Sequence, residues 1–314
     1  MVDSSETPTR TGVILLAHGA PNRVRDIPEY LRNIRGGKTS SPETIREVAS
    51  RYEQIGGSSP LLEITQNQAE ALQTFLNQEG DRFRVYVGMR NWAPYIRNVV
   101  RQALDDGVNQ LVALCLAPQF SKWSIGRYLS AFNEALGTVN ANGMDIRFIS
   151  RWPNAPGLID AFAERHEAAA AKMREAGHQD FPTIFTVHSI PEGSVDYDKD
   201  PYVTEYDKTL QGLVQRLNLK NWYQSYQSQG MIPVPWLEPT VEDTIDKIAA
   251  KGEKAALIFP VGFVCDHIEI LYDIDIAFRE HAEKAKVELF RTESLNASPL
   301  FIEALAGVVW EHLI

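Results

Sequence analysis

The sequence predicts an α/β protein built from two similar lobes, each a parallel sheet flanked by helices. Short apolar runs alternate with stretches of helical spacing along all 314 residues. The alternation occurs twice, in about four strand–helix units each time. The two sets are separated by Pro and Gly in RWPNAPG at 151–157. Such alternation is typical of parallel sheets with helices on both faces.

The first lobe is expected to span residues 11–152. Apolar or alternating runs predict its strands at Gly12–Ala17, Phe83–Met89, Gln110–Leu116 and Ile146–Ser150. Apolar residues at helical spacing predict its helices at Pro42–Tyr52, Ile64–Gln78, Ala93–Asp106 and Lys122–Leu136.

The second lobe is expected to span residues 153–298. Its strands are predicted at Thr183–Val187, Trp222–Gln227, Lys254–Val261 and Val287–Arg291. Its helices are predicted at Gly157–Ala176, Val203–Leu217, Thr240–Lys251 and Asp266–Glu283. A last helix, Pro299–His312, is expected to cross back, so that residues 299–314 pack on the first lobe.

Composition excludes several classes of protein. The net charge of −10 and the lack of a nucleic-acid-binding motif argue against a nucleic-acid partner. The two cysteines, Cys115 and Cys265, form no CxxC motif, which argues against a disulfide framework or an iron–sulfur cluster and favours a reducing compartment. The N-terminus lacks the apolar core of a signal peptide, and no run of about 18 apolar residues occurs. We therefore expect a cytoplasmic protein.

A histidine stands where a strand of the second lobe ends, in FTVHSIPEG at 185–193. Ligands of open α/β sheets bind beyond the carboxyl ends of the strands, so His188 is expected to face a cleft between the lobes. The alternative is a buried histidine whose ring is satisfied by a backbone carbonyl. The sequence context leaves both open.

Acidic residues follow another strand of the same lobe, in GFVCDHIEILYDID at 262–275. Asp266, Glu269 and Asp273 would share one face of an α-helix, where a metal ion or a proton would relieve their repulsion. On spacing alone, a capping box formed by Asp266 and Glu269 is the favoured alternative. A histidine and a carboxylate together could bind a divalent metal or move protons.

These segments resemble the ferrochelatase family. HSIPEG at 188–193 resembles its H-S-x-P motif, and VGFVCDHIEILYD at 261–273 resembles its second signature. RYEQIGGSSPLLEIT at 51–65 and PWLEP at 235–239 also match, and the resemblance runs from Thr11 to the C-terminus. It implies two Rossmann-like lobes around a porphyrin cleft and insertion of Fe²⁺ into a porphyrin in haem biosynthesis. It also favours a catalytic Glu269 over the capping box.

The resemblance implies roles for individual residues. His188 and Glu269 match the family's invariant pair, expected to meet the metal and take the pyrrole protons, and Asp273 either extends an acidic relay or lies on a solvated helix face. The positions expected to contact the porphyrin are Arg35, Arg51, Tyr52, Ser59 and Tyr128. Basic residues that either meet its propionates or lie on a solvated amphipathic helix cluster at Arg23, Arg25, Arg32, Arg35 and Lys38. Tryptophans that could be pocket walls or core residues are Trp92, Trp123 and Trp236.

Two positions depart from the pattern of relatives. In LLAHGAP at 15–21, His18 stands where the Gram-positive coproporphyrin branch often has a tyrosine that ligates product iron. His18 could be that axial ligand, opposite His188, or could bond a neighbouring backbone group. The segment also resembles L-x-x-H-G-S of sirohydrochlorin chelatases, which keeps a sirohydrochlorin or cobalt chelatase open. Ala277 replaces a Glu of some relatives, so no outer metal site is expected.

The implied activity is ferrochelatase, with coproporphyrin III favoured over protoporphyrin IX by the match through positions 11–65 and by the basic cluster. Iron and porphyrin would be substrates of a monomer without a permanently bound cofactor. The chain ends at Ile314 without the cysteine-bearing extension of animal relatives, so no iron–sulfur cluster is expected. The iron donor and the haem acceptor are not identified. An alternative of another class, a non-catalytic haem or porphyrin carrier, would not need both His188 and Glu269.

Overall fold

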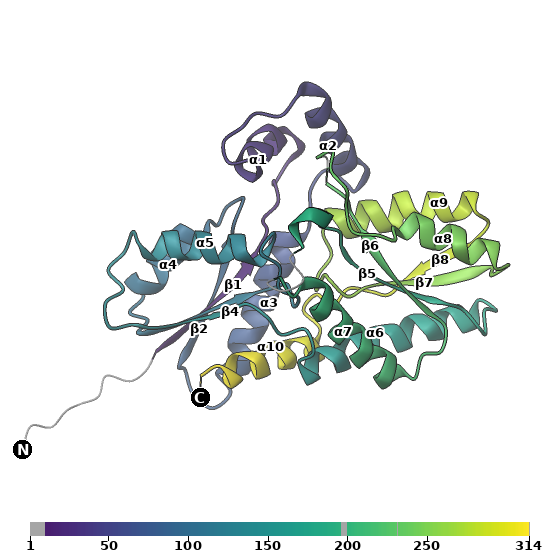
Figure 1. The fold of residues 1–314 in the computed structure, drawn as a ribbon. Helices are drawn as coiled ribbons and strands as arrows, with labels where there is room; N and C mark the ends of the chain where they lie inside the picture. The colour runs from purple at the N-terminus through teal and green to yellow at the C-terminus, as the bar shows by residue number, and fades with distance from the viewer. Residues whose placement is uncertain (1–9, 196–199, 231, 314) are drawn as a thin grey trace, which may run out of the picture.

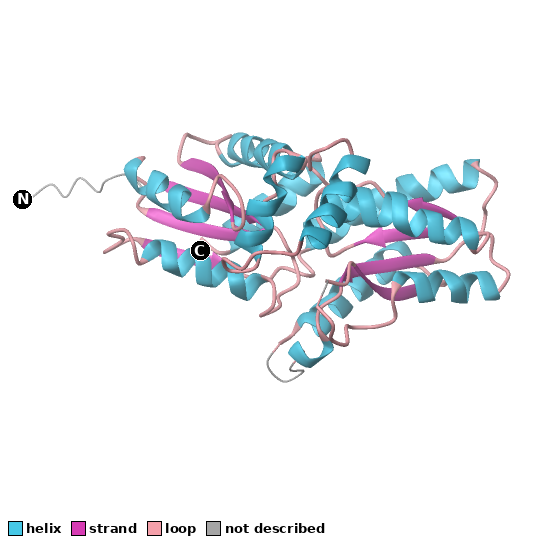
Figure 2. Cartoon of the chain, turned by 90° about the horizontal axis from the view of Figure 1, so that it is seen from above, coloured by secondary structure: helices cyan, strands magenta, loops and turns pink. Residues whose placement is uncertain are grey.

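The computed structural model describes residues 10–195, 200–230 and 232–313, and it contains two four-stranded sheets. All strand pairs within both sheets are parallel, in the orders β2-β1-β3-β4 and β6-β5-β7-β8. Figures 1 and 2 show the sheets at the two ends of an elongated molecule, with helices on both faces of each. The predicted fold class is confirmed.

The first sheet is covered by a different set of helices on each face. Its strands are β1 (Thr11–Ala17), β2 (Phe83–Met89), β3 (Gln110–Cys115) and β4 (Asp145–Ile149). Alternate side chains of a strand point to opposite faces. Val13 and Leu15 therefore pack toward α3 (Leu61–Leu76), whereas Ile14 and Leu16 pack toward α4 (Ile96–Asp105) and α5 (Ile125–Leu136).

The second sheet repeats this arrangement. Its strands are β5 (Thr183–His188), β6 (Trp222–Gln227), β7 (Ala255–Pro260) and β8 (Glu288–Arg291). Phe185 and Phe259 pack toward α6 (Pro156–Glu175) and α7 (Tyr202–Leu217). The other face meets α8 (Val241–Ala250), a π-helix η3 (Glu269–Phe278) and α9 (Arg279–Lys284).

The last helix, α10 (Pro299–Glu311), connects the lobes. It packs against α3 of the first lobe and α6 of the second, and one hydrophobic core continues across all three helices. Gly157 lies where α6 meets α10, and a Cβ built there would be 2.9 Å from the Cα of Ala304. The absence of a side chain at this position allows the close approach of the two helices. The boundary between residues 152 and 153 stays a prediction.

A small helical layer stands above the junction of the lobes (Figure 1). It consists of η1 (Val24–Asp26), α1 (Ile27–Ile34) and α2 (Pro42–Gln54); a further short turn, η2 (Glu192–Ser194), follows β5. Ile27, Leu31 and Tyr52 form its buried core, against which Ile268 of the second lobe packs. The sequence predicted α2 but not α1. No helix of the described residues is both long and apolar enough to span a bilayer.

The prediction of one α-helix over Asp266–Glu283 is wrong. The first ten helical residues, Glu269–Phe278, form a π-helix, and only Arg279–Lys284 are α-helical. The capping box is wrong too, because the backbone N–H of Glu269 donates to Nδ1 of His267 at 3.1 Å and the Asp266 carboxylate is bound elsewhere. Apolar spacing does not distinguish these helix types, since Ile270, Ile274 and Phe278 reach the sheet in the π form.

Candidate active site

The carboxyl ends of strands from both sheets open into one cleft of about 320 Å³. The first lobe contributes His18 after β1 and Arg90 after β2, and the second lobe contributes His188 at the end of β5. Further lining side chains come from the helical layer and from the segment after β7: Tyr30, Ile34, Tyr52, Ser59, Phe263, His267, Ile268 and Glu269. The lining is largely apolar with a few polar groups, which is typical of sites for flat organic ligands.

His188 is fixed by its backbone and by one side of its ring. The Tyr202 hydroxyl donates to the His188 carbonyl at 2.6 Å, and ring Nδ1 bonds to the carbonyl of Ser189. A carbonyl oxygen only accepts, so Nδ1 carries the proton of that bond. Nε2 consequently points to Glu269, with 3.5 Å between Nε2 and Oε1. The two interpretations of this histidine therefore both hold: a backbone carbonyl satisfies the ring, and the ring faces the cleft.

The two groups of the pair shift each other's pKa. Burial opposes ionisation of both groups, but each charge favours the other. Burial alone would lower the pKa of His188, whereas the Glu269 charge raises it above its usual value. Burial alone would raise the pKa of Glu269, whereas His188 brings it down to about 2. The cleft thus contains a carboxylate that stays ionised at neutral pH beside an imidazole whose pKa is raised.

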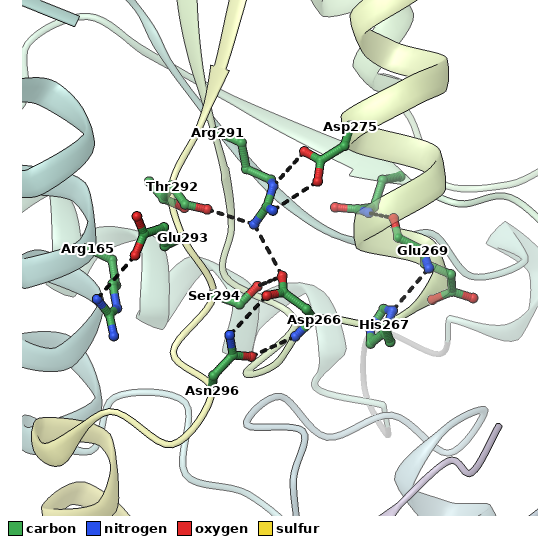
Figure 3. Close-up of polar contacts among 11 residues, drawn as sticks. Arg165, Asp266, His267, Glu269, Asp275, Arg291, Thr292, Glu293, Ser294 and Asn296 are labelled. Carbon is green, nitrogen blue, oxygen red and sulfur yellow. Dashed lines mark hydrogen bonds and ion pairs between the residues drawn. The ribbon is translucent and has the colours of Figure 1, made fainter. Parts of the chain in front are cut away.

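Asp273 extends the acidic face of the π-helix, but Asp266 does not. The hydroxyl of Ser228 donates to Oδ2 of Asp273. Burial and the neighbouring Glu269 charge raise the pKa of Asp273 to about 6. Asp266 turns away from the cleft and accepts hydrogen bonds from Ser294 and Asn296 (Figure 3). The predicted row of three carboxylates is therefore a row of two.

His18 is exposed to the cleft and has partners on both ring nitrogens. Nδ1 lies 3.2 Å from the carbonyl of Gly19, and Nε2 lies 3.0 Å from Nδ2 of Asn91. Arg90 Nε donates to Oδ1 of Asn91 at 3.2 Å. A guanidinium can only donate, so this contact fixes the amide orientation and makes Asn91 Nδ2 the donor to Nε2. His18 consequently carries its proton on Nδ1.

His18 is a neutral imidazole at neutral pH. The ring is open to the cleft, but the walls of the cleft around it keep bulk water away. This desolvation, with a smaller contribution from the Arg90 charge, lowers its pKa to about 4. Its Nε2 lone pair is the one suited to a metal, and it is occupied by the Asn91 N–H. The predicted backbone contact exists, at Gly19, and it engages Nδ1, so Nε2 is the nitrogen that meets Asn91.

The other residues expected at the porphyrin divide into two groups. Tyr52, Ser59 and Tyr128 line the cleft. Arg35 and Arg51 do not: Arg35 donates to Ser40 at 3.2 Å, and Arg51 pairs with Glu47 at 2.6 Å.

The tryptophans also differ. Trp123 lines the cleft, whereas Trp92 is buried against Tyr30. Trp236 lies in the segment after β6, where its indole N–H donates to the carbonyl of Ile232. Only the first of these three is therefore a wall of the cleft.

Sequence reasoning missed two cations of the cleft, Arg90 and Arg127. The Arg90 guanidinium lies over the Tyr128 ring at 5.7 Å, and that of Arg127 lies over Trp123 at 4.3 Å. Neither forms an ion pair with a carboxylate among the described residues. The signal for Arg90 was available, because Arg90 directly follows the strand Phe83–Met89, just as His188 ends its own strand. All five residues of the predicted basic cluster are exposed: Arg23, Arg25, Arg32, Arg35 and Lys38.

Within the described part of the chain, no three His, Cys, Asp or Glu side chains are grouped to hold a metal ion. A His–carboxylate pair such as His188 and Glu269 suits passing contact with a divalent metal, since imidazole and carboxylate both ligate such ions.

Comparisons with known proteins agree over nearly the whole chain. A family model described as Ferrochelatase matches residues 10–313. A protein named Ferrochelatase from Acidobacterium capsulatum is 43% identical, over 97% of this chain and 95% of its own. A protein named Coproporphyrin III ferrochelatase from Oceanobacillus iheyensis is 35% identical, over 96% of each chain.

Solved structures share the fold at low sequence identity. The sirohydrochlorin chelatase SirB from Bacillus subtilis subspecies spizizenii, in complex with cobalt, matches with a TM-score of 0.55 and 9% identity, over 96% of this chain and 95% of that chain. DR2241 from Deinococcus radiodurans matches with a TM-score of 0.52 and 15% identity, over 96% of this chain and 55% of that chain. These likenesses extend to the two-lobe architecture alone.

Proposed function

The chain belongs to the ferrochelatase family of enzymes, and on that premise we propose that it inserts Fe²⁺ into coproporphyrin III in preference to protoporphyrin IX. The observation that carries the proposal is the His188–Glu269 pair, 3.5 Å apart in the cleft between the lobes. Iron and porphyrin are both substrates, and one chain contains the complete pair. The absence of a bound cofactor, the monomeric state and the cytoplasmic location stay predictions.

The reaction requires what this pair offers. Fe²⁺ takes the place of two pyrrole N–H protons, and the iron keeps its oxidation state. A general base must lie within hydrogen-bond reach of those protons. The Glu269 carboxylate, ionised because its pKa is about 2, can meet the incoming iron or accept a proton. Asp273, whose pKa is about 6, is suited to pass protons on toward solvent.

The preference for coproporphyrin III rests on charge. This porphyrin carries four propionates and protoporphyrin carries two, so it gains more from cationic neighbours. Arg90 and Arg127 line the cleft without a carboxylate partner among the described residues, and the exposed basic cluster surrounds α1 beside it. The relative from Oceanobacillus iheyensis is named for coproporphyrin III.

His18 is proposed as an axial ligand of product iron, on the side of the porphyrin opposite His188. It is neutral, it lines the cleft, and its Nε2 carries the unprotonated lone pair. Iron would have to displace the Asn91 N–H from that nitrogen, so the ligation is expected to be readily reversible. The sirohydrochlorin or cobalt alternative also rests on this histidine.

The test is an anaerobic assay with Fe²⁺ that offers coproporphyrin III and protoporphyrin IX in parallel and follows metallation by absorbance. Faster use of coproporphyrin supports the proposal, and faster use of protoporphyrin refutes the preference. Metallation of neither would favour sirohydrochlorin with cobalt, or a carrier.

Glu269→Ala separates an enzyme from a carrier. It is expected to lower turnover by about 100-fold or more, because a general base contributes about 10²–10⁴-fold. Porphyrin binding, measured by fluorescence quenching, should persist. Unchanged turnover would show that Glu269 does not have the proposed role. Glu192→Ala, an exposed change in the turn after β5, is the control.

A further inference from the structure

Arg291 joins two carboxylates that lie on either side of Glu269 in the sequence. It stands at the end of β8 and contacts Asp266, just before the π-helix, and Asp275, inside it. We propose that these three residues form a positioning clamp, which fixes the π-helix so that Glu269 faces His188. The proposal rests on the proposed function, because it concerns the placement of the same carboxylate.

The contacts of the clamp are directional. Arg291 Nε and Nη2 donate to the two oxygens of Asp275 at 2.8 and 2.9 Å, and Nη1 lies 3.3 Å from Oδ1 of Asp266. Figure 3 shows Asp275 facing Arg291 from the helix, with Asp266 on the other side of the guanidinium. A bidentate pair of this kind fixes orientation as well as distance. The helix is thereby attached to the last strand of the sheet.

The start of the helix is fixed by the same network. Asn296 forms two hydrogen bonds with Asp266. Its side-chain N–H donates to Oδ2 at 2.9 Å, and its Oδ1 accepts from the Asp266 backbone N–H at 2.9 Å. The Ser294 hydroxyl donates to Oδ1 of Asp266 at 2.7 Å. These contacts hold the chain three residues before Glu269, so the first turn begins from a fixed point.

Glu269 itself has few contacts that could place it. Within the described residues its carboxylate meets only His188, at 3.5 Å, and its backbone carbonyl accepts a long hydrogen bond from Gln227 at 3.5 Å. Ile270 and Ile274 pack the helix on the sheet, but apolar packing is non-directional. The directional contacts that place Glu269 are therefore those of the clamp, together with the hydrogen bond from its backbone N–H to His267 and the one that Ser228 donates to Asp273.

Stability alone does not account for such a network. The side chains of Arg291, Asp266 and Asp275 are only 16%, 21% and 27% exposed. Removing charges from water is costly, and apolar residues often stabilise a protein equally well at such places. A retained, mostly buried network is understandable if it specifies the geometry of the neighbouring carboxylate.

The experiment compares Arg291→Met with the wild type in the full chain. A misplacement of about 1 Å can lower a rate by about 100-fold, so kcat is expected to fall by about that factor. Porphyrin affinity should stay within about twofold, because Arg291 lies outside the cleft lining. Hydrogen exchange of the backbone amides of Glu269–Phe278 should become faster. Asp275→Asn should change kcat and exchange in the same direction by less.

Two controls separate positioning from general loss of stability. Arg216→Met breaks the exposed pairs of Arg216 with Asp160 and Glu167 and should leave kcat unchanged. Ile248→Ala removes a buried side chain of α8 and should lower Tm without lowering kcat at a temperature where the protein is folded.

Three results would overturn the clamp: an unchanged kcat in Arg291→Met, a kcat loss equal to that of Ile248→Ala, or a parallel loss of porphyrin affinity. If Arg291→Met does not fold, the same criteria apply to Asp275→Asn. Metallation of neither porphyrin by the wild type would refute the proposed function itself. An active Glu269→Ala would refute the role of Glu269 and with it the clamp, whereas an inactive Glu269→Ala beside a fully active Arg291→Met would refute only the clamp.

Discussion

At the scale of single residues, the site combines groups whose protonation states are set by their neighbours. Arg90 orients Asn91, and Asn91 in turn occupies Nε2 of His18. His188 lowers the pKa of Glu269, and Glu269 raises that of His188. The first set of contacts leaves a neutral imidazole in the lining of the cleft, and the second leaves an ionised carboxylate there.

The His18 arrangement predicts opposite effects of two substitutions. His18→Ala should change the absorption spectrum of bound product haem more than it changes porphyrin binding, because the ligand is lost. Asn91→Leu should slow haem dissociation several-fold, because iron no longer competes with the Asn91 N–H for Nε2. Stopped-flow absorbance of haem release measures the second effect.

The control for this pair is Tyr30→Phe, which removes a hydroxyl beside Nδ1 of His18 and leaves the contact between Asn91 and Nε2 in place. It should leave the product spectrum unchanged. Identical product spectra in the wild type and in His18→Ala would refute axial ligation by this residue.

Asp273 predicts a dependence of stability on pH. Burial, with the Glu269 charge, raises its pKa from 3.8 to about 6 in the folded protein. The folded state therefore binds more protons between these values, and the free energy of unfolding should fall as pH rises from about 4 to 6. Asp273→Asn should remove this loss and stabilise the protein at pH 7 by about 3 kcal/mol. Urea unfolding at pH 4.5 and 7 would measure it, and an equal effect at both pH values would contradict it.

At the scale of helices and strands, the sequence determines the strands better than the helices. Burial and pattern coincide where a strand is a buried apolar run: Ala255–Pro260 was predicted to within one residue at each end. Phe83–Met89 and Trp222–Gln227, which also contain polar residues, begin and end as predicted. The π-helix was not predictable, because Asp266 and Glu269 have the spacing of a capping box and only the distant Arg291, Ser294 and Asn296 take Asp266 away from that role. His188 and Glu269 were singled out from their places after strands, but only the family resemblance favoured a catalytic Glu269 over the capping box. Arg51 was expected at the porphyrin, but it lies outside the cleft lining and forms an ion pair with Glu47 of its own helix.

The crossing of α6 and α10 predicts a contrast between two glycines. Gly157→Ala should lower the free energy of unfolding by about 1–3 kcal/mol, because the added Cβ would be 2.9 Å from Ala304. Gly307→Ala, on the exposed side of α10 with no atom within 4 Å of the new Cβ, should raise it by about 0.5–1 kcal/mol. Urea denaturation of both variants measures the contrast, and equal signs would contradict it.

At the scale of the whole molecule, the cleft depends on contacts that hold one lobe to the other. The segment after β3 in the first lobe is bound by α7 and its flank in the second lobe. Phe120 N donates to Glu205 Oε2 at 2.6 Å, and Lys122 N donates to Asp200 Oδ2 at 2.9 Å. The bound segment leads directly into Trp123 and Arg127, which line the cleft. The sequence could not reveal these pairs, because the partners are about 80 residues apart.

This attachment predicts that a residue outside the cleft controls porphyrin affinity. Glu205 is 1% exposed, so Glu205→Ala leaves the Phe120 N–H unpaired in the interior. That should lower the free energy of unfolding by about 1–3 kcal/mol and, by loosening the wall that carries Trp123, raise the porphyrin Kd several-fold. Glu167→Ala, which removes an exposed ion pair of the same lobe, should change neither. If Glu205→Ala loses stability but binds porphyrin as tightly as the wild type, the wall is held by its own lobe, and the contact between the lobes serves stability alone.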